Sequence, residues 1–108
     1  METHRVKLRD GTEATLYRVG SGSWACPVCG STDLAQQPYY DDGSASFDMC
    51  SCGFEFGFDD DPGASPDAEP SVAANWTRWR SLYLRKLQAH PAALTQVTAR
   101  LRAIGVVT

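Results

Sequence analysis

The chain has 108 residues, of which 43% are hydrophobic, and its formal net charge is only −3. This length fits one domain, and this hydrophobic share is ordinary for a globular protein, which argues against a disordered chain. No apolar stretch approaches membrane-spanning length and the N-terminal residues lack the apolar core of a signal peptide, so we expect a cytoplasmic protein with no membrane partner.

The first predicted element is a β-hairpin, because polar and apolar residues alternate through residues 4–20 around an Asp-Gly pair. A two-residue loop would mix polar and apolar side chains on each face. A three-residue loop at residues 10–12 pairs Val6 with Leu16 and keeps the apolar side chains on one face. We therefore predict this three-residue loop.

Two short strands are predicted farther along, at residues 45–49 and 53–58, on either side of the second pair of cysteines. The second has the stronger case, since aromatic residues favour a pleated surface. Its phenylalanines recur at every second position and so share one face, which we expect to be buried against the helices that follow: Phe54, Phe56 and Phe58.

An acidic loop rich in Pro and Gly separates this region from two predicted helices. Apolar side chains recur at helical spacing along the first helix, at Val72, Trp76, Trp79, Tyr83 and Leu87. Pro91 ends or kinks that helix. The second helix covers about residues 92–104 and stops at Gly105.

The four cysteines form two short-spaced pairs, Cys26-Pro-Val-Cys29 and Cys50-Ser-Cys52, with twenty residues between them. Two such pairs at this separation are typical of a zinc ribbon, in which four thiolates surround the ion as a tetrahedron. A glycine follows each pair, and a positive φ at that glycine would let backbone N–H groups point at the sulfurs. We therefore predict one structural Zn²⁺, held by Cys26, Cys29, Cys50 and Cys52.

Other uses of the cysteines are less favoured. Disulfides do not suit a reducing compartment, and no βαβ pattern of a thioredoxin-like redox pair surrounds them. The second pair is one residue shorter than the usual Cys-x-x-Cys, which leaves the geometry of the fourth ligand open. His4 or His90 would replace it only if the fold brought one of them near, and we expect packing or surface roles for both.

Three stretches carry a resemblance to a family: CPVCG at residues 26–30, YYDDGS at 39–44 and SFDMCSCGFEFGFDD at 46–60. Together they resemble the small bacterial cysteine-rich zinc-ribbon proteins of the CPCC type. The resemblance covers about residues 24–61, roughly a third of the chain, and the second cysteine pair lacks one residue of the family pattern. It implies the zinc site and no particular activity.

The predicted fold is therefore α+β and the chain is a single domain, residues 1–108. Its successive parts are a hairpin (1–23), a zinc ribbon (24–61), an acidic loop (62–70) and two helices packed on the ribbon (71–108). Four thiolates would fill the coordination sphere of zinc and leave no position for a substrate, and no catalytic motif is found. We predict that the protein is not an enzyme.

Charge is strongly separated along the chain, because residues 24–71 contain ten acidic residues and no Lys or Arg. Such a segment repels phosphate and favours a basic protein partner, so we predict an immunity or inhibitor protein for a basic toxin or nuclease. Solubility alone also explains an acidic surface. The predicted partner-binding residues are Asp41, Asp42, Asp59, Asp60 and Asp61.

The alternative is a nucleic-acid-associated protein that uses its helices. Residues 72–108 contain six basic residues and no acidic one, and Arg78 and Arg85 fall seven residues apart on one helical face. These arginines would equally suit a solvated helix exterior or ion pairs with the acidic segment.

Overall fold

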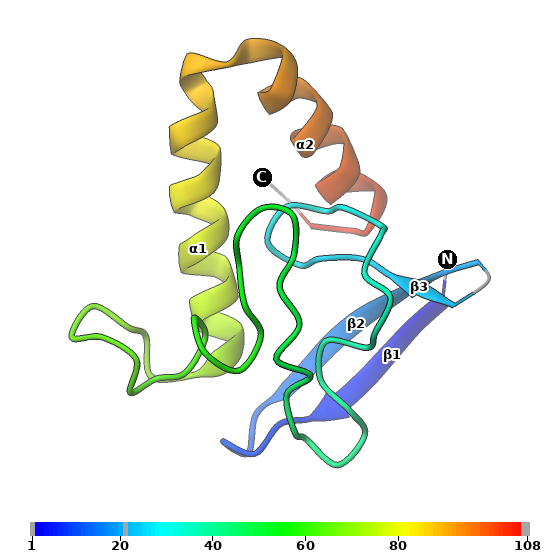
Figure 1. Ribbon diagram of the computed structural model, residues 1–108, viewed down its shortest axis with the longest axis vertical. Coiled ribbons are helices and arrows are strands. Elements are labelled where there is room, and N and C mark those ends of the chain that lie inside the picture. Colours follow the sequence, from blue (N-terminus) through cyan, green and yellow to red (C-terminus); the bar gives the residue numbers. More distant parts are fainter. Residues whose placement is uncertain (1, 21, 107–108) are drawn as a thin grey trace.

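The structure, a computed structural model, describes residues 2–20 and 22–106. An antiparallel sheet comes first, with strand order β1 (Glu2–Lys7), β2 (Glu13–Val19) and β3 (Ser23–Trp24). The helices come last: α1 (Val72–Lys86), the short 3₁₀ helix η1 (Leu87–Ala89) and α2 (Pro91–Ala103). The loops of the cysteine segment, residues 24–61, run between α1 and the sheet (Figure 1). The predicted α+β class is confirmed.

The β1–β2 hairpin forms, but its register differs from the prediction, since Val6 pairs with Ala14 rather than with Leu16. The loop has three residues, and these are residues 9–11, closed by a 2.8 Å hydrogen bond between the flanking residues. Gly11 (φ 86°) stands at the last loop position, where a three-residue hairpin needs left-handed backbone. Because the register differs by two residues, the apolar side chains still share the buried face: Val6, Leu8, Ala14 and Leu16.

Strand β3 was not predicted, because two residues are too short to show an alternating pattern. It pairs antiparallel with β2, and its Trp24 also bridges to Leu34, whose carbonyl accepts a 2.8 Å hydrogen bond from the Trp24 N–H. This pairing leads the chain from the edge of the sheet directly to Cys26.

The two strands predicted at residues 45–49 and 53–58 do not form as regular strands. A single bridge joins Met49 to Glu55, and a series of turns follows. Phe54 and Phe56 are buried as expected, but Phe58 is 62% exposed. The alternation of buried and exposed side chains ends at Gly57. Its φ of 98° turns the chain, so that Phe58 does not lie on the buried face.

Helix α1 covers the two buried phenylalanines. The ring of Trp79 packs edge-on against Phe54, with 5.5 Å between ring centroids, and Trp76 packs edge-on against Phe56 at 6.4 Å. Ser71 caps the helix by accepting a hydrogen bond from the Ala74 N–H. Asp10 of the hairpin loop accepts a second bond, from the N–H of Val72 (2.9 Å), and so ties the sheet to the helix start.

Helix α2 was predicted to pack on the phenylalanine face with α1, and it does not. Its buried side chains, Val97 and Leu101, belong to a second core cluster with Ala25 and Leu87, backed by Tyr17 and Val19 of β2. Figure 1 shows α2 turning back from the end of α1 toward the first loop of the cysteine segment. None of the helices in the described residues is long and apolar enough to cross a membrane.

Candidate metal centre

The four cysteines lie together between α1 and the sheet. All four sulfur atoms lie within 4.8 Å of one another, and three of the side chains are buried while Cys52 is half-buried. All four cysteines are free, and 3.5 Å separates the sulfurs of Cys29 and Cys50, far more than a disulfide bond of about 2.05 Å. A zinc ion with bonds of about 2.3 Å to tetrahedral sulfurs places them about 3.8 Å apart, which these separations fit.

The first pair belongs to a tight turn that we call the first knuckle, residues 26–31. The N–H of Gly30 donates to the carbonyl of Cys26 (2.7 Å), and the N–H of Cys26 donates to the carbonyl of Ser31 (2.7 Å). Gly30 has φ 76°, as predicted from its position after the pair. The N–H of Ser31 lies against the Cys29 sulfur, in the direction that favours a thiolate.

The second pair forms the second knuckle, residues 50–54, by the same means with one residue fewer. The N–H of Cys50 donates to the carbonyl of Phe54 (2.9 Å), and the N–H of Gly53 donates to the carbonyl of Cys50 (2.8 Å). Gly53 has φ 92°, again as predicted, and the N–H of Phe54 lies against the Cys52 sulfur. The shorter Cys-x-Cys spacing therefore still brings both sulfurs into the cluster.

Crowding of the thiols determines their acidity. Hydrogen bonding to Cys29, with further contributions from Cys50, Cys52 and burial, raises the pKa of the Cys26 thiol well above its usual range. Four thiols packed in this way do not all ionise by themselves. A divalent cation among the sulfurs stabilises the thiolates and reverses this direction, so metal binding would be coupled to release of protons.

Arg80 of α1 lies beside the first knuckle, a role that no pattern in the sequence predicts. Its Nε and Nη2 both donate to the carbonyl of Pro27, at 2.9 and 2.6 Å. Burial lowers the pKa of the Arg80 guanidinium, which nevertheless stays charged at neutral pH. A zinc ion with four thiolates carries a net negative charge, so this half-buried cation also suits the electrostatics of such a centre.

Neither histidine takes part in the cluster. The Nε2–H of His4 donates to the Asp41 carboxylate at 2.6 Å, and the ring packs edge-on against Trp24. His90 is exposed between η1 and α2. Their surface and packing positions are those expected from the sequence.

The predicted partner-binding aspartates have different environments. Asp41, Asp42 and Asp61 are exposed, and Asp59 is half-buried, where its carboxylate accepts a 2.8 Å hydrogen bond from the N–H of Glu55. Asp60 is 0% exposed. Its burial removes Asp60 from the acidic surface and leaves four of the five predicted residues on it.

Asp60 is instead the centre of a buried polar network. Its carboxylate accepts hydrogen bonds from the N–H of Gly57 and the indole N–H of Trp76, both at 2.8 Å, and from the Tyr39 hydroxyl. Burial raises the pKa of Asp60, although these three hydrogen bonds oppose that effect. Asn75, also 0% exposed, donates to the Asp60 carbonyl at 3.0 Å.

This network was missed in the sequence, where Asp60 stands in a run of three aspartates that looks uniformly solvated. The available signal was Asn75, which stands beside Trp76 at the start of the apolar stripe of α1. A polar side chain at such a position needs buried partners.

Comparisons of the chain with known protein families, with curated proteins and with solved structures gave no match. The resemblance to the CPCC-type proteins therefore stays a prediction from the residues, and the geometry of the chain itself is the basis for a functional proposal.

Proposed function

We propose that the four cysteines hold one structural Zn²⁺ as a zinc ribbon, and that the protein is a non-catalytic module that binds another protein. The observation that carries the proposal is the cluster of four free sulfurs within 4.8 Å, enclosed by two knuckles. Thiolates are ligands that zinc favours, and two turns with positive-φ glycines are suited to present them.

A role in binding rather than in catalysis is supported by the composition of the ligand set. Catalytic zinc keeps one coordination position for water or substrate, and its protein ligands commonly include His or a carboxylate. Here four thiolates would complete the tetrahedron. The ion would then stabilise the loops around it and activate no substrate.

A basic partner is supported by the charge of the surface around the centre. The cysteine segment and the following loop, residues 24–71, have ten acidic residues and no basic one. Six of these acids are exposed: Asp33, Asp41, Asp42, Asp61, Asp67 and Glu69. Such a field speeds association with a basic protein and can cover a cleft built for phosphate. An immunity or inhibitor protein for a basic toxin or nuclease fits this description.

The test is affinity purification from native cells with two zinc-loaded baits, the wild-type protein and the variant Asp41→Asn/Asp42→Asn/Asp61→Asn. We expect a basic protein to be enriched on the wild-type bait, and the purified pair to associate more slowly as salt rises. The variant should bind the same protein with a smaller association rate and a weaker salt dependence. An absence of any basic protein that prefers the wild-type bait would contradict the proposal.

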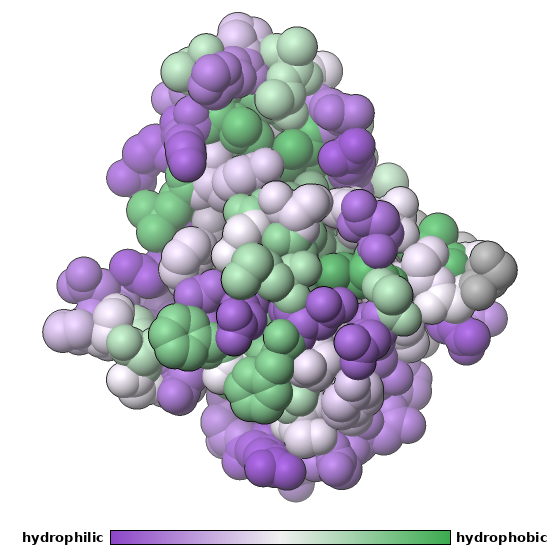
Figure 2. Space-filling view, in the orientation of Figure 1, coloured by the Kyte–Doolittle hydropathy of each residue, from purple (hydrophilic) through white to green (hydrophobic). Residues whose placement is uncertain are grey.

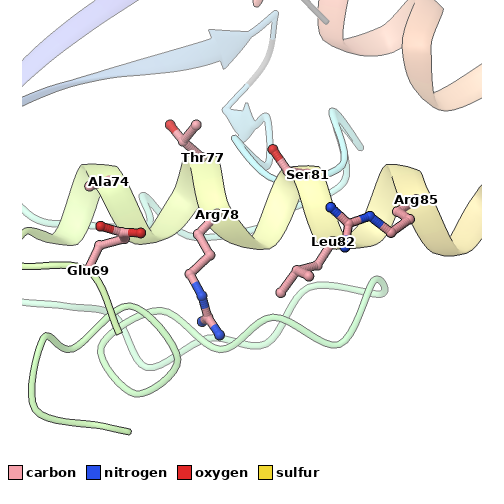
Figure 3. Close-up of a pocket in the computed structure, with 7 residues that line it drawn as sticks. All are labelled: Glu69, Ala74, Thr77, Arg78, Ser81, Leu82 and Arg85. Atoms are coloured by element: carbon pink, nitrogen blue, oxygen red, sulfur yellow. The ribbon is translucent and has the colours of Figure 1, made fainter. Parts of the chain in front are cut away.

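A second candidate function, association with nucleic acid, rests on one groove. Arg78 and Arg85 line it along the exposed side of α1, together with Thr77 and Ser81, and the acidic Glu69 lines one end (Figure 3). Among residues 2–20 and 22–106, neither arginine forms an ion pair with an acidic side chain. Two unpaired guanidinium groups beside hydroxyls can contact phosphates.

The acidic cysteine segment opposes this second candidate, because it repels the same phosphates. We expect binding of duplex DNA or single-stranded RNA no tighter than the non-specific range of about 10⁻⁴–10⁻⁶ M at physiological salt. A tighter, salt-sensitive complex that Arg78→Glu/Arg85→Glu abolishes would place nucleic-acid binding first.

A further inference from the structure

Three large apolar side chains lie exposed on the cysteine segment: Phe47, Met49 and Phe58. We call them the aromatic patch, after the two phenylalanines. Their exposed fractions are 63%, 59% and 62%. Figure 2 shows bulky hydrophobic side chains on the loops between α1 and the sheet, largely surrounded by hydrophilic ones. The buried core contains Phe54 and Phe56, so the three exposed side chains are not part of the core packing.

The local backbone explains why these side chains face outward together. Met49 bridges to Glu55 in antiparallel fashion, so that these two side chains lie on the face opposite to the buried Phe54 and Phe56. The ring of Phe47 lies over Gly57 on this outer face, so close that a Cβ at Gly57 would come within 2.7 Å of a ring carbon. Phe58 follows directly after that glycine.

Phe47 is also the only described residue other than glycine with a positive φ, at 57°. Aromatic residues rarely adopt this left-handed backbone, whereas Asn and Gly adopt it readily. A strained conformation that presents an exposed ring does not serve the buried core. Such outliers persist where the presented side chain has another use.

The charges around the patch indicate what it contacts. Asp48, Glu55 and Asp59 alternate with the patch residues along the chain, and Asp61 lines a shallow hollow that Phe47 and Gly57 also line. Arg9 and Asp10 of the hairpin loop line the same hollow, so the acids around the patch outnumber the one basic side chain. No basic residue occurs anywhere in residues 24–71. Two copies of this face would repel each other, so an isologous dimer through the patch is unfavourable.

From these observations we propose that the aromatic patch is the anchor point for a partner segment in which Lys or Arg residues flank an apolar side chain. The inference rests on the proposed function and specifies the partner's chemistry. The acids around the patch would pair with the flanking cations, and the patch would bury the apolar side chain. Aromatic anchors surrounded by polar groups are the usual centre of a binding interface.

The test uses two synthetic peptides of equal charge and the zinc-loaded protein. One peptide has Lys and Arg around a Trp-Leu pair, and the control peptide has Ser in place of Trp and Leu. The patch variant is Phe47→Asn/Phe58→Ser, because Asn suits the left-handed backbone at position 47. The charge variant is Glu55→Gln/Asp61→Asn. Fluorescence anisotropy at low and at physiological salt gives the affinities.

We expect the wild-type protein to bind the Trp-Leu peptide at least tenfold more tightly than the Ser peptide. The patch variant should lose this preference while keeping its zinc content and its melting temperature. The charge variant should weaken both peptides by a similar factor. Equal affinities of the two peptides for the wild-type protein would overturn the inference, and the proposed function, which requires charge alone, would stand.

Two further results distinguish the inference about the patch from the proposed function. If a native basic partner, once identified, binds the patch variant as tightly as the wild type, the inference is overturned although the proposed function is supported. A second copy of the chain is the other occupant to examine, since the α1 groove offers Leu82 between Arg78 and Arg85. Concentration-dependent self-association that both the patch variant and Arg78→Glu/Arg85→Glu abolish would overturn the inference in favour of that second copy.

Discussion

The two knuckles are built by the same backbone hydrogen bonds but are held by different surroundings. The first knuckle is enclosed: Cys26 and Cys29 are buried, the carbonyl of Pro27 accepts two bonds from Arg80 of α1, and Gly30 touches the backbone of α2. The second knuckle is less completely enclosed, although Trp79 of α1 packs on its Phe54. Cys52 is half-buried, and a Cβ added at Gly53 would meet no atom within 4 Å.

The first knuckle is therefore the more rigid half of the cluster. Both helices contact the first knuckle, so its shape is fixed by the fold even without a metal. In the proposed zinc centre, the second knuckle would depend more on the metal to stay closed. We therefore expect metal loss to begin with the opening of the second knuckle, and the following predictions test that asymmetry.

The largest effects are expected from the ligands themselves. Each of Cys26→Ser and Cys52→Ser leaves three thiolates, and zinc affinity should fall by more than about a hundredfold, since even changes behind the ligands can cost about that much. Cys26→Ser should be the worse of the two, because Cys52 lies where water can take the lost position. Competition with a colorimetric chelator measures both affinities. A larger loss for Cys52→Ser would reverse the proposed asymmetry.

The glycines give the next largest contrast. Gly30→Ala and Gly53→Ala both force alanine into a positive φ, which costs about 1 kcal/mol. Only Gly30→Ala also drives a methyl group to 2.9 Å from the α2 backbone, which adds about 2 kcal/mol. Urea unfolding of the zinc-loaded proteins should therefore show Gly30→Ala as the less stable variant by that margin. Equal stabilities would mean that α2 does not brace the first knuckle.

Two neighbouring aspartates after the second knuckle, Asp60 and Asp61, differ in burial and should differ in their effect on stability. Asp60→Asn places an amide N–H₂ against at least one of three donors, so it should lower the free energy of unfolding by about 2 kcal/mol. The matched control Asp61→Asn should change it by less than about 0.5 kcal/mol, because Asp61 is exposed. If both variants unfold alike in urea, Asp60 is not the anchor that its contacts indicate.

The smallest effect concerns the contact between α1 and the first knuckle. Arg80→Met removes both hydrogen bonds to the Pro27 carbonyl and should cost about 1.5 kcal/mol, whereas Arg78→Met, on the groove side of the same helix, should stay within about 0.5 kcal/mol. Thermal unfolding of the two zinc-loaded variants compares them. We also expect Arg80→Met to release zinc faster to excess chelator, and an unchanged release rate would argue against a link between Arg80 and the centre.

Features that depend on short-range sequence patterns could be predicted from the sequence. The hairpin, both helices, the gathering of the cysteines and the positive φ of Gly30 and Gly53 all follow from spacing and residue type. The hairpin register was wrong by two residues, because both registers bury the same side chains and only the position required by Gly11 distinguishes them.

Features that depend on contacts between distant segments could not be predicted in this way. The burial of Asp60 depends on Trp76 and Tyr39, which come from separate parts of the chain, and nothing in the aspartate run distinguishes it from Asp61. The contact of Arg80 with Pro27 spans 53 residues. The position of α2 over the first knuckle, rather than over the phenylalanines, likewise depends on tertiary packing.

X-ray absorption at the zinc edge, with metal analysis of the same sample, shows whether the four cysteines form a closed structural zinc centre. One zinc per chain with four sulfur ligands at about 2.3 Å is the predicted result. A zinc ion with fewer than four sulfurs and an oxygen or nitrogen ligand, or protein purified from cells under reducing conditions without any zinc, would contradict it.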